Sequence, residues 1–136
     1  MHLQFIVDNK TKRIVSGEAL SRWETSEGEV IMPGKYIGLM EKSGLITKFD
    51  YYMFESVCDK LSKWAKTDFK ELTISCNFTR ITISEKDFVT KIKNIADRYE
   101  FDRSKLIMEI TEDSIEKNLD VARNNIIKAK ELGFHI

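Results

Sequence analysis

The most constraining feature of the sequence is a regular alternation between strand-like and helix-like segments in its second half. Runs rich in β-branched and other apolar residues occupy 72–76 and 106–110, and a further run begins at 134–136. In the intervening segments, 84–99 and 119–133, apolar side chains recur every three or four residues, as on one face of a helix. Strands that alternate with helices through short connections are parallel with right-handed crossovers, so the sequence predicts an α/β fold. In such folds, binding and chemistry collect at the carboxyl ends of the strands.

The N-terminal residues predict a hairpin that precedes this alternating unit. An apolar run at 3–7 stops at the turn residues 8–10 and resumes at 13–16, directly before Glu18. Glu18 is therefore expected on or at the end of a strand. The polar residues 25–29 are expected to form a loop.

Two helices are expected between the hairpin and the first parallel strand. Pro33 suits the start of a short helix, and Gly44 suits its end. Thr47 followed by Asp50 resembles a capping signal for a second helix that runs to about residue 66. Its apolar stripe recurs at intervals of four, four and three residues, at Met53, Val57, Leu61 and Trp64. A stripe of this kind is typical of a core face, and no cofactor role is assigned to it.

Composition excludes several classes of protein. With 136 residues, the chain is expected to form one domain over 1–136, and its 22 basic and 22 acidic residues give no reason to propose a nucleic-acid polymer or an anionic membrane as partner. Cys58 and Cys76 lack the spacing of a zinc site and are expected to be reduced, packed thiols. No run approaches the roughly 20 apolar residues of a membrane span, and no signal peptide is recognisable. A cytoplasmic location is expected for this chain, with a membrane anchor elsewhere in a longer parent protein as the alternative.

Charged residues interrupt the apolar pattern near the end of the hairpin. On a strand, Glu18, Leu20 and Arg22 would project from one face. A carboxylate and a guanidinium on a partly covered face require each other, a metal or a charged ligand. The alternative is an ordinary interaction between Glu18 and Arg22 on a solvated sheet, which the spacing alone favours.

A second unusual carboxylate stands within the strand predicted at 106–110. Every other residue of that strand is apolar, so Glu109 needs a partner, which is either a cation from the protein or a bound metal. Asn77 follows the preceding strand, and Glu18 ends the hairpin, so the three oxygen-bearing side chains are candidates to converge on one rim. Such oxygens suit hard cations such as Mg²⁺, Mn²⁺ or Ca²⁺. Glu112 belongs either to the same rim or to the cap of the following helix.

Several short motifs, taken in order along the chain, resemble those of one family. They are Glu18-Ala19-Leu20 with Arg22-Trp23, Pro33 with Ile37, Gly44-Leu45-Ile46, Asn77 at a strand end, and Glu109-Ile110-Thr111-Glu112. The sequence resembles the N-terminal half of an EAL domain, the cyclic di-GMP phosphodiesterase family of bacterial signalling. The resemblance extends over nearly all of the chain.

The resemblance implies roles for individual residues. Glu18, Asn77 and Glu109 match the family's ligands of divalent metal, Mg²⁺ or Mn²⁺, and Glu112 matches a supporting glutamate. The residues that match positions associated with the dinucleotide are Gln4, Leu20 and Arg22. The implied reaction is metal-assisted attack of water on one phosphodiester bond of cyclic di-GMP, which gives linear pGpG.

The resemblance also implies a barrel of which this chain supplies only a part. The family fold is an eight-stranded βα barrel with an antiparallel first strand, and a full barrel takes about 250 residues. Family ligands beyond Ile136 are not in this sequence, so the chain alone is expected to be inactive. A second copy or the C-terminal half is expected to cover the open barrel. The alternative function is a non-catalytic module that acts as a cyclic di-GMP receptor or as an interaction and dimerisation domain. Small departures from the family pattern occur at Phe5, Gly38 and 79–81.

Overall fold

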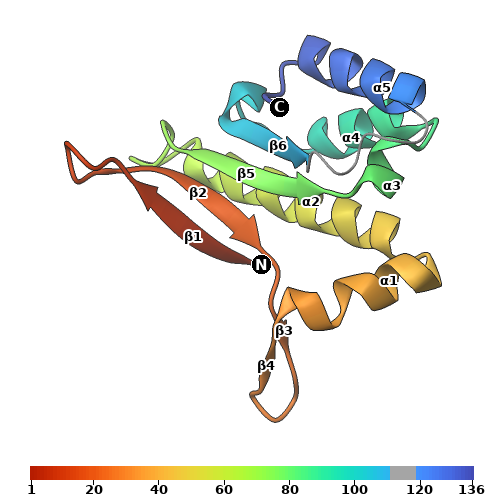
Figure 1. Cartoon of the computed structure of the whole chain (residues 1–136). Helices are drawn as coiled ribbons and strands as arrows, with labels where there is room; N and C mark the ends of the chain where they lie inside the picture. The colour runs from red at the N-terminus through yellow and green to blue at the C-terminus, as the bar shows by residue number, and fades with distance from the viewer. Residues whose placement is uncertain (111–118) are drawn as a thin grey trace.

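A mixed four-stranded sheet forms the centre of the protein. The computed structural model describes residues 1–110 and 119–136. The sheet has the order β1-β2-β5-β6, with β1 (His2–Val7), β2 (Ile14–Leu20), β5 (Thr73–Phe78) and β6 (Leu106–Ile110). β1 and β2 are antiparallel, whereas β2, β5 and β6 run parallel (Figure 1). The predicted hairpin and the predicted parallel α/β unit are therefore both confirmed.

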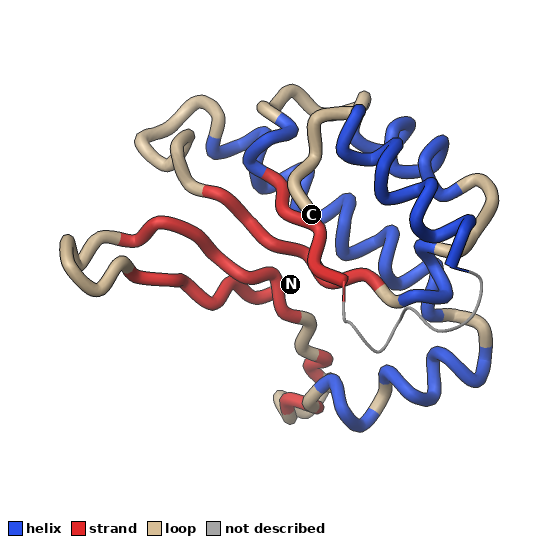
Figure 2. Tube along the Cα trace, turned by 45° about the horizontal axis from the view of Figure 1, so that its top comes forward, coloured by secondary structure: helices blue, strands red, loops and turns tan. Residues whose placement is uncertain are grey.

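Helices cover one face of this sheet (Figure 2). They are α2 (Ile46–Trp64), α4 (Phe88–Ala96) and α5 (Leu119–Glu131). The strand residues that alternate toward the helices are apolar and buried, namely Ala19, Ile74, Cys76, Phe78, Leu106 and Met108. Phe54 of α2 is fully buried among them and packs its ring against those of Phe78 and Phe134. Because the core lies on this side, the opposite face of the sheet is left for polar side chains.

The segment between β2 and α2 is more structured than the sequence indicated. The expected polar loop 25–29 is the tip of a small hairpin formed by β3 (Trp23–Glu24) and β4 (Val30–Ile31). The expected short helix is split into a 3₁₀ turn, η1 (Pro33–Lys35), and α1 (Ile37–Ser43). Gly44 ends α1 with a φ of 72°, a left-handed conformation that suits glycine.

Two predicted helix caps are wrong. Ser84 does not start α4; it ends an unpredicted short helix, α3 (Arg80–Ile83), and α4 begins four residues later. Thr47 and Asp50 do not cap α2, because the helix already starts at Ile46 and the Asp50 carboxylate accepts hydrogen bonds from residues that follow β5.

The C-terminal end of the chain returns to the sheet. A 3₁₀ turn, η2 (Arg103–Lys105), leads into β6. After α5, the run at 134–136 forms an isolated parallel bridge between Ile107 and His135 instead of a strand. The bridge is parallel to β6, which is the direction that the sequence predicts for this run.

Both cysteines are packed inside the protein, as the sequence predicts. Cys58 and Cys76 are free and buried, and burial raises the pKa of the Cys58 thiol to about 12. Within the described ranges, no helix combines the length and the apolar character that crossing a membrane requires.

Candidate functional site

Four polar side chains form a row across the face of the sheet that the helices do not cover. Gln4 of β1 pairs with Glu18 of β2, and Asn77 of β5 pairs with Glu109 of β6. Glu18 and Asn77 are linked by a hydrogen bond in which the Asn77 Nδ2 donates to the Glu18 Oε1 over 3.1 Å. Side chains alternate along a strand, so these residues point away from the buried core. We call Gln4, Glu18, Asn77 and Glu109 the polar row.

The polar row lies near the carboxyl ends of the parallel strands. Glu18 is two residues before the end of β2, and Asn77 and Glu109 are each one residue before the ends of β5 and β6. The hydrogen bond and the strand register thus bring together the three residues that the sequence placed on one rim. Asn77 lies inside its strand and not beyond it, because Phe78 still pairs with Ile110.

The chemistry of the polar row fits part of the coordination shell of a hard cation. Glu18 and Glu109 supply carboxylate oxygens, and the hydrogen bond from the Asn77 Nδ2 to Glu18 leaves the amide oxygen of Asn77 free to act as a further metal ligand. Oxygen ligands of this type suit Mg²⁺, Mn²⁺ or Ca²⁺. No group of three or more His, Cys, Asp and Glu side chains placed to hold a metal occurs in the part of the chain that the structure describes. The two carboxylates and the amide therefore make a partial site.

The sheet position next to the polar row carries a buried hydroxyl. Ser75 pairs with Glu18 across β2 and β5, and it is 2% exposed. Its Oγ has no hydrogen-bond partner among the described residues. The sequence signal that would have identified it is the alternation within β5, since Ser75 and Asn77 are two residues apart and share a face.

Leu20 and Asn77 line a cavity of about 240 Å³ beside the polar row. Its other walls come from η1, the start of α1, α2 and the end of β5, and include Pro33, Ile37, Phe49, Asp50 and Met53. The cavity is mostly apolar, with the polar row at its side. It extends the site from the sheet toward the first two helices.

Asp50 is a buried carboxylate in the wall of this cavity that sequence reasoning missed. Its Oδ2 accepts hydrogen bonds from the Thr79 amide, the Thr79 hydroxyl and the Thr82 hydroxyl at 2.9, 2.6 and 2.6 Å. Desolvation raises the pKa of Asp50 above its usual value, although these hydrogen bonds oppose the shift. The available signal was an acid on the apolar face of a helix. Asp50 fixes the turn that follows Asn77.

Arg22 is not on the face that carries Glu18, and this expectation is wrong. β2 ends at Leu20, where the chain leaves the sheet for the β3–β4 hairpin, so the alternation that would align Arg22 with Glu18 stops. The Arg22 Nη1 donates to the backbone oxygen of Ser21 at 2.7 Å. Arg22 lines a separate cavity of about 300 Å³ with an aromatic wall formed by Trp23, Tyr36, Phe49 and Tyr52. Glu112 lies outside the described residues.

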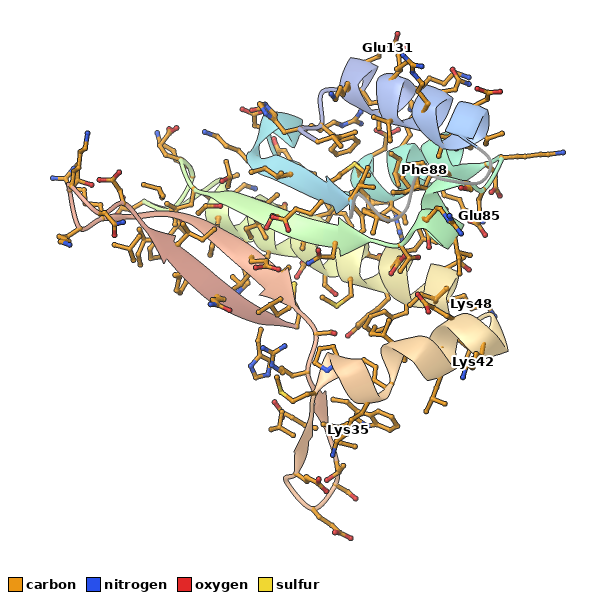
Figure 3. The ribbon with its side chains drawn as sticks, in the orientation of Figure 1. Lys35, Lys42, Lys48, Glu85, Phe88 and Glu131 are labelled. Atoms are coloured by element: carbon orange, nitrogen blue, oxygen red, sulfur yellow. The ribbon has the colours of Figure 1, made fainter. Side chains whose placement is uncertain are left out.

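A second polar cluster, at the corner between α3 and α4, satisfies its own hydrogen bonds. Glu85 accepts from the Tyr51 hydroxyl at 2.7 Å and from Lys91 at 2.9 Å, and the buried Asn125 donates to the backbone oxygens of Ile83 and Glu85. Figure 3 shows Glu85 close to Phe88 at this corner, on the helical side of the sheet. These bonds join α2, α4 and α5, so this cluster is structural and the polar row remains the candidate site.

Comparison with known proteins agrees with this arrangement. A family model described as EAL domain matches residues 1–136. The signaling protein YkoW of Bacillus subtilis (strain 168) is 26% identical over 136 residues, which is 100% of this chain and 17% of YkoW. The bifunctional diguanylate cyclase/cyclic di-GMP phosphodiesterase MucR of Pseudomonas aeruginosa is 27% identical over 109 residues, which is 80% of this chain and 16% of MucR.

A solved structure of similar fold shows how much of the domain is present. The structure of the PaMucR phosphodiesterase in complex with c-di-GMP matches with a TM-score of 0.83 at 24% identity. The match covers 98% of this chain and 55% of that chain. The chain therefore spans about half of the solved relative and less than a fifth of the curated relatives. The expectation of a partial barrel is confirmed.

Proposed function

The chain belongs to the EAL domain family, and we propose that its polar row is part of a site that hydrolyses cyclic di-GMP to linear pGpG with the help of Mg²⁺ or Mn²⁺. The observation that carries the proposal is the hydrogen bond between Asn77 and Glu18 at the carboxyl edge of the sheet, with Glu109 in register beside it. Relatives that are named as cyclic di-GMP phosphodiesterases support the same choice of substrate.

Within this proposal, Glu18, Asn77 and Glu109 hold the cation through their side-chain oxygens. A bound Mg²⁺ or Mn²⁺ would make a water molecule more acidic and offset the charge that develops on the phosphate. Glu18 has a second role, because it accepts a hydrogen bond from the Asn77 Nδ2 and so turns the amide oxygen of Asn77 toward the cation. Glu112 is proposed to support this edge, as its position in the family motif implies.

Substrate contacts are proposed for Gln4, Leu20 and Arg22. Arg22 would contact a phosphate, since a guanidinium can grip two phosphate oxygens at once. To do so it must exchange its bond to the Ser21 backbone oxygen for the ligand. Leu20 faces the apolar cavity of about 240 Å³, which suits the flat face of a nucleobase. Gln4 is at the β1 end of the polar row and would contact the ligand from that side.

We propose further that the 136-residue chain by itself binds cyclic di-GMP and the cation without turnover. Mg²⁺ requires about six ligands in near-octahedral geometry, and the polar row offers three. The same shortage of ligands supports a second candidate function, a receptor that binds cyclic di-GMP and does not cleave it.

Calorimetry with cyclic di-GMP, in the presence and absence of Mn²⁺, tests the proposal. We expect Mn²⁺ to strengthen binding, Glu109→Gln to remove this enhancement, and chromatography to detect no pGpG. Glu131→Gln is a matched control, because Glu131 is an exposed acid on α5 (labelled in Figure 3), and α5 lies on the face of the sheet opposite to the polar row. Absence of binding with and without Mn²⁺ would refute the proposed site. Mn²⁺-dependent formation of pGpG would refute the inactivity of the chain alone. An affinity for cyclic di-GMP that is the same with and without Mn²⁺ would favour the receptor.

A further inference from the structure

Ser75 places an unsatisfied hydroxyl directly beside the polar row. The residue is 2% exposed, and its Oγ has no hydrogen-bond partner within the described protein. Ser75 is opposite Glu18 and two residues before Asn77, so its side chain points to the face that carries the row. Burying a hydroxyl without a partner costs free energy. The position therefore calls for a partner that the surrounding side chains do not supply.

The side chains around Ser75 on this face do not hydrogen-bond to it. On β2, the residue opposite Ser75 is Glu18, whose Oε1 accepts from Asn77. On β5 itself, Asn77 donates to Glu18, and the Thr73 hydroxyl donates to the Ser16 hydroxyl. On β6, the residue opposite Ser75 is Ile107, which has no polar side-chain atom. The described side chains thus leave the Ser75 hydroxyl without a partner, and a small polar ligand beside the polar row would supply one.

We propose that the Ser75 Oγ accepts a hydrogen bond from a water molecule in the hydration shell of a divalent cation held by Glu18, Asn77 and Glu109. This inference rests on the proposed function. A Mg²⁺ or Mn²⁺ ion with three protein ligands keeps several water molecules. Water on a cation is a strong donor, and a serine hydroxyl offers two acceptor lone pairs. Ser75 is thus a positioning residue, which acts on the cation through water.

The chain contains a matched control for this inference. Ser84, at the end of α3, is the other residue in the described ranges whose side-chain oxygen is buried without a partner. It is outside the sheet and not part of the polar row. Replacing either serine by alanine removes an equivalent buried hydroxyl, but only Ser75 faces the proposed cation.

The test measures Mn²⁺ binding to the whole 136-residue chain. The electron paramagnetic resonance signal of free Mn²⁺ reports how much of the ion remains unbound. We expect Ser75→Ala to weaken Mn²⁺ binding about tenfold, as is usual when a group behind a metal ligand is lost. Ser84→Ala should stay within about twofold of the wild type. Thermal melting gives a second readout with opposite signs. Without metal, both variants should melt about 3 °C higher, because each loses an unsatisfied group. With Mn²⁺, only Ser75→Ala should lose most of the metal-induced stabilisation.

The possible failures can be told apart. If the wild type binds Mn²⁺ and Ser75→Ala binds it equally well, the role of Ser75 is overturned and the proposed function stands. If the wild type shows no saturable Mn²⁺ binding, the proposed function fails and the inference fails with it. An equal loss in both variants would mean a general effect on folding and would also overturn it. Should Ser75→Ala not fold, Ser75→Cys keeps a similar volume with a weak acceptor and is expected to show the same tenfold loss.

Discussion

Replacing Asp50 by alanine tests how α2 supports the site. The Asp50 Oδ2 is the common acceptor for the amide and hydroxyl of Thr79 and for the hydroxyl of Thr82, which is fully buried. In Asp50→Ala one of the two hydroxyls can still donate to the other over 3.1 Å, so two of the three donors lose their acceptor. An unsatisfied buried donor costs about 1–3 kcal/mol, and removing a desolvated carboxylate returns part of this. We expect a net loss of about 2–3 kcal/mol in the free energy of unfolding.

Urea denaturation measures this loss. With a slope of about 2 kcal/mol per molar urea for a chain of this size, the midpoint should fall by about 1–1.5 M. Asp50→Asn keeps the volume and an acceptor oxygen, and should lose less than about 1 kcal/mol. Asp68→Ala is the control, because Asp68 is exposed, and its midpoint should not move. An Asp50→Ala midpoint that matches this control would refute the claim that the carboxylate holds the turn.

The same variant should respond to pH with a defined sign. The pKa of Asp50 in the folded protein is raised above 3.8, chiefly by desolvation, so the carboxyl binds its proton more tightly when folded than when unfolded. The stability that Asp50 contributes is therefore largest below pH 3.8 and falls as the pH rises through the folded pKa. The gap in unfolding free energy between the wild type and Asp50→Ala should be wider at acidic than at neutral pH. A gap that widens toward neutral pH would show that hydrogen bonds, and not desolvation, dominate the shift.

Three further predictions concern the substrate contact, the thiols and the open sheet. Arg22→Ala should weaken cyclic di-GMP binding at least tenfold by calorimetry. Arg22→Lys should not restore the affinity, because an ammonium cannot make two parallel bonds to phosphate. Unchanged affinity in Arg22→Ala would exclude the contact. Cys58 and Cys76 should react with Ellman's reagent only in guanidinium, since both are buried and burial raises the pKa of each thiol. A rapid reaction of the folded chain would contradict their burial. Light scattering during size-exclusion chromatography should show a mass that rises with protein concentration, because the β1–β2 hairpin exposes apolar side chains. These side chains are 42–48% exposed and belong to Phe5, Ile6, Val7, Ile14 and Val15. A constant monomer mass would count against association.

The strands and the polar row were predictable because strand signals are local. Apolar runs identified β1, β2, β5 and β6, and polar residues at or near the strand ends identified Glu18, Asn77 and Glu109. Parallel alternation then required these ends to meet at one edge. Only this topological step was needed to bring the three residues together.

The misses have a different physical origin, because they depend on where an element stops. Arg22 was placed on the face of Glu18 by assuming that the strand continues, whereas the ladder ends at the pair of Leu20 and His2. Ser84 and Asp50 were assigned to helix N-termini, but Ser84 ends α3, and the Asp50 carboxylate accepts hydrogen bonds from Thr79 and Thr82, which are 29 and 32 residues away in the sequence. Ends of elements depend on hydrogen bonds to residues distant in sequence, and a local pattern does not contain these.

The position of Asn77 is determined more by its neighbours than by the site itself. Cys76 and Phe78 are buried on the helical side of β5, so Asn77 must point to the opposite face. Turning it away would expose the Phe78 ring, which packs against Phe54 and Phe88. Exposing a buried phenylalanine costs about 2–3 kcal/mol, more than the roughly 1 kcal/mol of the hydrogen bond between Asn77 and Glu18. Core packing therefore orients the amide, and the hydrogen bond only selects which of its two atoms faces Glu18.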